Sequence, residues 1–161
     1  MVGDLQAARY REIEIRTASP TELVVLMYDS AISALQQARD FMRAGDIAGR
    51  ARCLNKASSI LTELQATLNL DAGGEIARSL DRLYTYMRNS LFQANARQDV
   101  SPIDEVARLM TNLRSAWIEV AKTEADQRKE TVKPSAPPAG AFPGLTAAPS
   151  TAQALGLSVT A

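Results

Sequence analysis

The chain has 161 residues, of which 46 % are hydrophobic and 22 % are charged, a composition close to that of an average globular domain. Its 18 lysine and arginine residues equal its 18 aspartate and glutamate residues. The chain therefore lacks the basic excess that binding to the phosphates of a nucleic acid requires. We predict a folded protein that does not bind nucleic acid.

Histidine is absent, and Cys53 is the one cysteine. The missing imidazole excludes a Ser-His-Asp triad and histidine-ligated zinc or di-iron sites. A single cysteine cannot form an internal disulfide and is typical of a reducing cytosol. We see neither a secretory signal at Met1 nor an apolar stretch long enough to span a bilayer. We therefore predict a cytoplasmic protein with no metal, no cofactor and no catalytic residue.

Cap signals divide the first four fifths of the chain into helices. Ser19, Pro20 and Glu22 form a capping box with proline in the first helical position. Glycine or a capping side chain marks the later boundaries, at Gly45, Asp46, Gly73 and Ser101. We expect helices over residues 19–44, 46–70, 75–97 and 101–129.

Each expected helix has apolar residues at a period near 3.6, and the short loops make neighbouring helices antiparallel. In the third helix the apolar face contains Ile76, Leu80, Leu83, Met87, Leu91 and Ala94. We predict an all-α fold, an antiparallel up-down-up-down four-helix bundle over residues 19–130. An extended leader over residues 1–18 precedes it.

The composition changes at the end of the bundle. From Pro134 to Ala161 there is no charged residue, and five of the seven prolines lie there. Such a segment has too little large apolar surface to offset the entropy of ordering. We predict a flexible Pro/Ala-rich tail over residues 131–161, with a short docking motif at Phe142 or Leu155–Leu157 as the alternative.

The first expected helix has more apolar surface than one core face needs. One stripe suffices for a bundle core: Leu23, Met27, Ala31, Ala34, Ala38 and Phe41. A second stripe remains: Val24, Val25, Tyr28, Ile32, Leu35 and Met42. Because a surface helix needs one apolar face, something must cover the second stripe.

Three arrangements satisfy this requirement. The helix can lie centrally and touch two neighbours, or it can form a groove that binds an amphipathic segment of another protein. In the third arrangement the leader covers the groove, because Tyr10, Ile13 and Ile15 alternate with charged residues in an extended pattern. The last two combine if a bound client displaces the leader.

Short motifs follow one another in a fixed order between residues 10 and 122. They are Tyr10, Thr17-Ala18-Ser19-Pro20, Met27-Tyr28-Asp29, Gly45-Asp46, Asn69-Leu70, Gly73-Gly74-Glu75-Ile76-Ala77, Leu83-Tyr84, Ala94-Asn95 and Leu113-Arg114 with Trp117. In order and spacing this set resembles the FliS family of flagellar secretion chaperones. The family usually has glycine where Ser30 stands, and the tail after residue 130 is not part of its pattern.

The resemblance implies a four-helix cytosolic chaperone without catalytic activity. Such a protein binds the unstructured C-terminal segment of flagellin, prevents premature filament assembly and presents its client to the gate of the flagellar type III secretion apparatus. Some members also bind other flagellar proteins, including an anti-sigma factor. The leader would occupy part of the client surface of the empty chaperone, a role that falls here on Tyr10, Ile13 and Ile15.

We predict client contacts on the second stripe of the first helix, because a bundle core does not need it, and at two tyrosines of the third helix. The predicted client-binding residues are Val24, Val25, Tyr28, Ile32, Leu35, Tyr84 and Tyr86. The main alternative is a structural or adaptor protein that forms a homodimer through the same stripe and has no affinity for flagellin. A more distant alternative is an enzyme that uses only carboxylates, which requires a pocket lined by acids of perturbed pKa.

Overall fold

The computed structural model describes residues 2–131, which form five helices and no strand. The helices are α1 (Val2–Thr17), α2 (Pro20–Ala44), α3 (Ile47–Ala66), α4 (Gly74–Arg97) and α5 (Ser101–Thr131). The predicted all-α class is confirmed for this part of the chain. The predicted tail over residues 131–161 lies outside the described residues, except for Thr131. The division of the chain into three parts stays a prediction.

Local signals in the sequence set the ends of α2. The Ser19 hydroxyl accepts a hydrogen bond from the backbone N–H of Glu22 at 3.2 Å, and the Glu22 carboxylate accepts one from the backbone N–H of Ser19 at 2.6 Å. These are the two bonds of the predicted capping box. Gly45 ends the helix with a φ of 73°, a conformation that glycine adopts without steric cost.

Helix α3 ends at Ala66, before the predicted end at residue 70. The side chain of Asn69 accepts hydrogen bonds from the backbone N–H groups of Asp71 and Ala72, at 3.2 and 3.0 Å. Asparagine favours such turns because its side chain replaces a backbone acceptor. The turn therefore starts earlier than the periodicity of leucine residues suggested.

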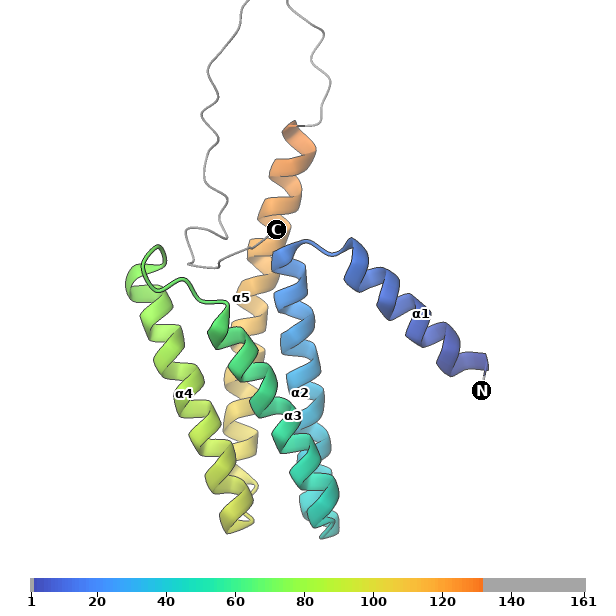
Figure 1. The fold of residues 1–161 in the computed structure, drawn as a ribbon, viewed down its shortest axis with the longest axis vertical. Helices are drawn as coiled ribbons and strands as arrows, with labels where there is room; N and C mark the ends of the chain where they lie inside the picture. Colours follow the sequence, from blue (N-terminus) through green and yellow to red (C-terminus); the bar gives the residue numbers. More distant parts are fainter. Residues whose placement is uncertain (1, 132–161) are drawn as a thin grey trace, which may run out of the picture.

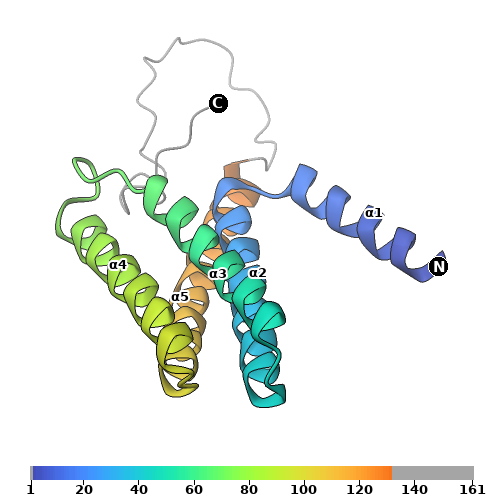
Figure 2. The ribbon, with the colours of Figure 1, turned by 60° about the horizontal axis from the view of Figure 1, so that its bottom comes forward.

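Helices α2 to α5 lie alongside one another, and successive helices run in opposite directions (Figure 1). Helix α2 packs against both α3 and α5, and α4 packs against the same two helices. The buried residues of the last three helices recur at the helical period and include Leu54, Ala57, Leu61, Leu64, Met87, Leu91, Ala94, Ile103, Val106, Met110 and Trp117. Toward its first residue α4 diverges from α5 (Figure 2).

Two tyrosine hydroxyls meet inside this core. The hydroxyl oxygens of Tyr28 on α2 and Tyr84 on α4 are 2.5 Å apart, and both side chains are at most 1 % exposed. Trp117 on α5 is buried in the same core cluster. Burial raises the pKa of both tyrosines, so each keeps its proton. The pair satisfies two polar groups that would otherwise be costly to bury.

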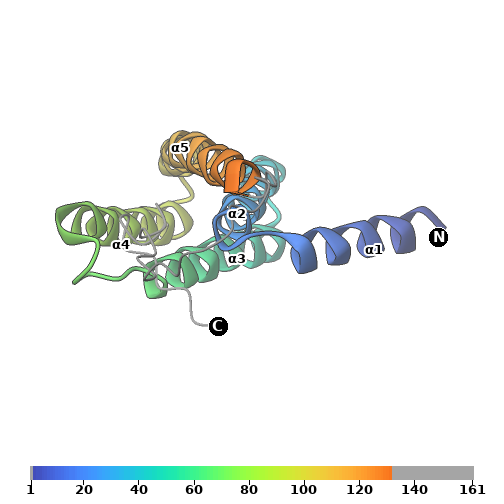
Figure 3. The same cartoon turned by 90° about the horizontal axis from the view of Figure 1, so that it is seen from above.

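The leader is a helix, and the prediction of an extended segment over residues 1–18 is wrong. Its first half consists largely of good helix formers such as Leu5 and Ala7, and Arg16 pairs with Glu12 one turn earlier at 2.8 Å. These local preferences outweigh the alternation of residues 10–16. Helix α1 points away from the other four helices (Figures 1 and 3).

The tyrosine pair predicts a specific pattern of stability losses. Tyr28→Phe strands the Tyr84 hydroxyl in the core and should lower the free energy of unfolding by about 1–3 kcal/mol. The double change Tyr28→Phe/Tyr84→Phe should cost less than the sum of the two single changes, because it leaves no hydroxyl unpaired. Urea denaturation, followed by the fluorescence of Trp117, measures these differences. Tyr86→Phe, at an exposed ring, is the control, and additive losses would contradict the pairing.

The raised pKa values also predict a loss of stability in alkali. The unfolded chain releases tyrosine protons near pH 10, whereas the folded chain retains those of Tyr28 and Tyr84. The free energy of unfolding should therefore be insensitive to both groups below about pH 10 and should fall above it, by about 1.4 kcal/mol per pH unit for each retained proton. Denaturation curves recorded across this range give the free energy of unfolding at each pH. Its fall with pH should be less steep for Tyr28→Phe/Tyr84→Phe than for the unchanged protein, and equal slopes would show that the two tyrosines do not retain their protons.

The exposure of α1 predicts that this helix opens readily. A helix of about 16 residues without a packed face is marginally stable in water. Its backbone amides should therefore exchange with deuterium far faster than those of α2, which packs on two sides. Hydrogen exchange read by mass spectrometry compares the two, and equal protection would show that α1 is packed in solution.

Candidate functional site

The second stripe of α2 belongs mainly to the core. Val24, Tyr28 and Leu35 are buried, and so is Tyr84 on α4. The prediction that the core does not need Val24, Tyr28 and Leu35 is wrong, and so is the expectation that Tyr84 is an exposed tyrosine. The reason is that α2 contacts both α3 and α5, so it needs two apolar faces, as in the first of the three arrangements considered above.

The other predicted client-binding residues lie nearer the surface. Val25 and Ile32 are half-buried and pack against the core. Tyr86 is exposed, and its hydroxyl donates a hydrogen bond to Glu105 at 2.9 Å. The structure therefore does not bring the seven residues together on one surface, and the role of each in client binding stays a prediction.

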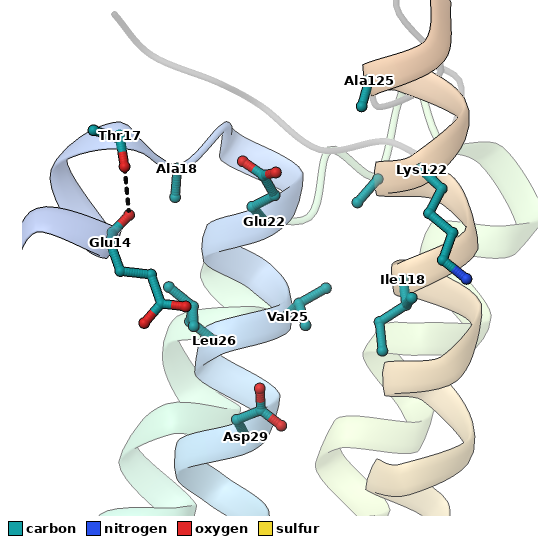
Figure 4. Close-up of a pocket in the computed structure, with 11 residues that line it drawn as sticks. Glu14, Thr17, Ala18, Glu22, Val25, Leu26, Asp29, Ile118, Lys122 and Ala125 are labelled. Atoms are coloured by element: carbon teal, nitrogen blue, oxygen red, sulfur yellow. Dashed lines mark hydrogen bonds between the residues drawn. The ribbon is translucent and has the colours of Figure 1, made fainter. Parts of the chain in front are cut away.

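A pocket of about 490 Å³ lies where α1 meets α2 and α5, and we call it the α2–α5 pocket (Figure 4). Val25 and Ile118 face each other across it from the two helices. It is lined by Glu14, Thr17, Ala18, Glu22, Val25, Leu26, Asp29, Ile118, Ala121, Lys122 and Ala125. The pocket thus combines apolar side chains with three acids and one lysine.

Two polar contacts hold α2 and α5 together beside this pocket. Asp29 forms an ion pair with Arg114, and the hydroxyl of Thr21 donates a hydrogen bond to Glu124 at 2.7 Å. Thr21 is fully buried. Because both contacts join the same two helices, they fix the spacing between Val25 and Ile118.

A second apolar surface lies on the first turns of α4. Ile76, Leu80 and Leu83, which we call the α4 stripe, line a shallow pocket of about 320 Å³ together with Glu75 and Ser79. Ile76 is 53 % exposed, so its predicted place in the core is wrong. Periodicity assigns it to a core face, but α4 has diverged from α5 at this level (Figure 2).

The predicted leader cover does not lie over either surface. Tyr10, Ile13 and Ile15 are each more than half exposed on α1. A helix turns by about 100° per residue, so Ile13 and Ile15 point to nearly opposite sides. An extended backbone would place these two on one side. Their role as a cover stays a prediction.

The described residues contain neither a candidate metal site nor a candidate membrane-spanning helix. Within residues 2–131 no cluster of acids or cysteine is arranged to hold a metal ion, and none of these helices is long and apolar enough to cross a bilayer. Among these residues Asp99 is the one carboxylate with a shifted pKa. Its pKa is lowered because the carboxylate accepts a hydrogen bond from the backbone N–H of Ser101 at 2.9 Å. That contact starts α5 and lies in neither pocket.

Comparison with known proteins places most of the described chain in one family. The model of the family described as flagellar protein FliS matches residues 3–124, which span α1 to α4 and most of α5.

Curated relatives agree with this match over long alignments. The flagellar secretion chaperone FliS of Salmonella typhimurium is 40 % identical over 111 residues, which is 68 % of this chain and 82 % of the relative. The protein of the same name from Escherichia coli is 38 % identical over 109 residues, which is 67 % of this chain and 80 % of the relative. That from Bacillus subtilis is 30 % identical over 119 residues, which is 74 % of this chain and 88 % of the relative. This chain belongs to the FliS family of flagellar secretion chaperones.

Proposed function

We propose that this protein is a flagellar export chaperone of the bacterial cytosol and has no enzymatic activity. It binds the unstructured C-terminal polymerisation segment of flagellin, prevents premature filament assembly and delivers the segment to the flagellar type III secretion gate. Family membership supports the class of function. The α4 stripe carries the proposal of client binding, because it is apolar and only partly covered: Ile76 is exposed, and Leu80 and Leu83 are half-buried.

The α4 stripe has the spacing that a docked helix uses. Ile76, Leu80 and Leu83 stand at i, i+4 and i+7, so they form one continuous ridge along the first turns of α4. Burying one such side chain contributes about 1.5–3 kcal/mol. Ile76 is exposed, while Leu80 and Leu83 are already partly buried against the core, so docking gains the contribution of one side chain in full and of two in part. This gain is comparable with the roughly 2–5 kcal/mol that ordering a disordered segment costs.

The α2–α5 pocket provides a second contact of different chemistry. Val25, Leu26 and Ile118 offer apolar surface, and Glu14 supplies a carboxylate, whereas those of Glu22 and Asp29 are engaged by Ser19 and Arg114. Such a site suits an apolar segment with a basic or hydrogen-bond-donating side chain at its edge. A client that contacts both surfaces gains affinity from each, because the second contact forms at a high effective concentration.

The leader fits this function as a displaceable cover. Thr17 and Ala18 line the α2–α5 pocket, so the chain connecting α1 to α2 already borders a client surface. When residues 10–15 become extended, Ile13 and Ile15 can cover part of that surface in the empty chaperone. Further partners follow from the same surfaces: the export gate protein, and an anti-sigma factor or another flagellar protein.

Calorimetric titration of the full chain with the C-terminal segment of the host's flagellin tests this function. We expect one-to-one binding with a negative heat-capacity change, the mark of apolar burial. Ile76→Asp should weaken binding roughly 10- to 150-fold, the equivalent of about 1.5–3 kcal/mol.

Ile47→Asp is the matched control, because Ile47 is also an exposed isoleucine. It is the first residue of α3, at the opposite end of the bundle from the start of α4 (Figure 1). It should leave the dissociation constant unchanged. Absence of heat, together with a homodimer in light scattering, would favour the self-associating structural protein instead. Equal losses in the two variants would remove the α4 stripe from the client surface.

A further inference from the structure

The α4 stripe is the open half of a face whose other half is buried. Ile76 shares a helical face with Met87 and Ala94, which lie three and five turns further along. Met87 and Ala94 are 0 % exposed, whereas Ile76 is 53 % exposed. The change in burial follows the divergence of α4 from α5 (Figures 1 and 2). The bundle therefore leaves room for one more apolar segment at this end.

We propose that the C-terminal tail of the same chain, residues 132–161, docks on the α4 stripe through Leu155 and Leu157. The family match ends at residue 124, so the tail lies outside what the chain shares with the FliS family. The inference concerns the chain alone and does not depend on which client it carries.

The position of the end of α5 makes this contact accessible. Helix α5 ends at Thr131, and α4 begins at Gly74 at the same end of the bundle (Figure 1). About 24 residues separate Thr131 from Leu155, and a flexible linker of that length spans on average roughly 25–30 Å. This reach is about three times the roughly 8–10 Å between packed helix axes, which leaves length for the wider separation of α4 and α5 at this end.

The charges of the two surfaces favour the α4 stripe over the α2–α5 pocket. The tail has no charged side chain from Pro134 onward, and Glu75 is the one charged residue lining the pocket on α4. The α2–α5 pocket contains three acids and a lysine, whose desolvation an uncharged segment would not compensate.

The end of the tail has the pattern of a segment that docks in extended form. Leu155, Leu157 and Val159 alternate with Gly156, Ser158 and Thr160. In an extended backbone the three apolar side chains point to one side. Because a tethered segment is present at a millimolar effective concentration, a weak contact is enough to populate the docked state. A client with higher affinity displaces it.

Paramagnetic labelling of the full chain tests this contact without any client. Cys53→Ser removes the native thiol, and Ser158→Cys places a spin label on the side of the extended segment opposite to Leu155 and Leu157. We expect the methyl signals of Ile76, Leu80 and Leu83 to lose intensity when the label is oxidised. The methyl signal of Ile47, at the first residue of α3, should not change.

Two tail variants of the labelled protein separate a specific contact from random approach. Leu155→Ser/Leu157→Ser should restore the intensity of the α4 stripe, and the matched change Ala152→Ser/Ala154→Ser should not. Equal attenuation at Ile47 and Ile76, attenuation centred on Ile118, or no attenuation would overturn the proposal. Attenuation that grows with protein concentration would also overturn it, because it would identify a second copy as the occupant. Since flagellin is absent throughout, none of these outcomes bears on the export function.

Discussion

The contact between the hydroxyls of Tyr28 and Tyr84 determines which residues of α2 and α4 must stay buried. It joins α2 to α4 through the centre of the core, 2.5 Å between oxygen atoms. Neither hydroxyl can be exposed without leaving the other buried and unpaired. The next residue, Asp29, pairs with Arg114 on α5. Two consecutive residues of α2 thus connect it to two different helices, which gives this segment a structural role and leaves Tyr28 without exposed surface.

Residues outside this network provide the surfaces available to a partner. Tyr86 lies two positions after the buried Tyr84 and is exposed. Phe92 directly follows the buried Leu91, and its side chain is 76 % exposed. Ile76 and its neighbours are open because α4 diverges, not because the sequence makes them polar. The core therefore supplies a packed scaffold, and incomplete packing at one end leaves apolar surface exposed.

Local chemistry in the sequence was sufficient to predict most of the described fold. The capping box at Ser19, the glycine at 45 and the cap at Asp46 each act within one turn, so their consequences do not depend on the remaining chain. Such local reasoning could not decide which of the two apolar stripes of α2 is buried in the core. Periodicity shows that both stripes are apolar, but it does not show how many helices surround α2, and that number decides which side chains are buried. The prediction of an extended leader was wrong for a local reason: good helix formers outweighed a short alternating pattern.

An uncovered apolar stripe has consequences in every state of a chaperone. Exposed patches of this kind invite self-association, so the α4 stripe gains from a cover whenever no client is present. Any cover that belongs to the chain reduces the apparent affinity for a client by the fraction of molecules in which the stripe is open. A weak, tethered cover keeps this reduction small and still shields the stripe, because its occupancy depends on effective concentration and not on tight contacts. For a chaperone of the proposed kind, a weak tethered cover would therefore limit self-association without competing strongly with the client.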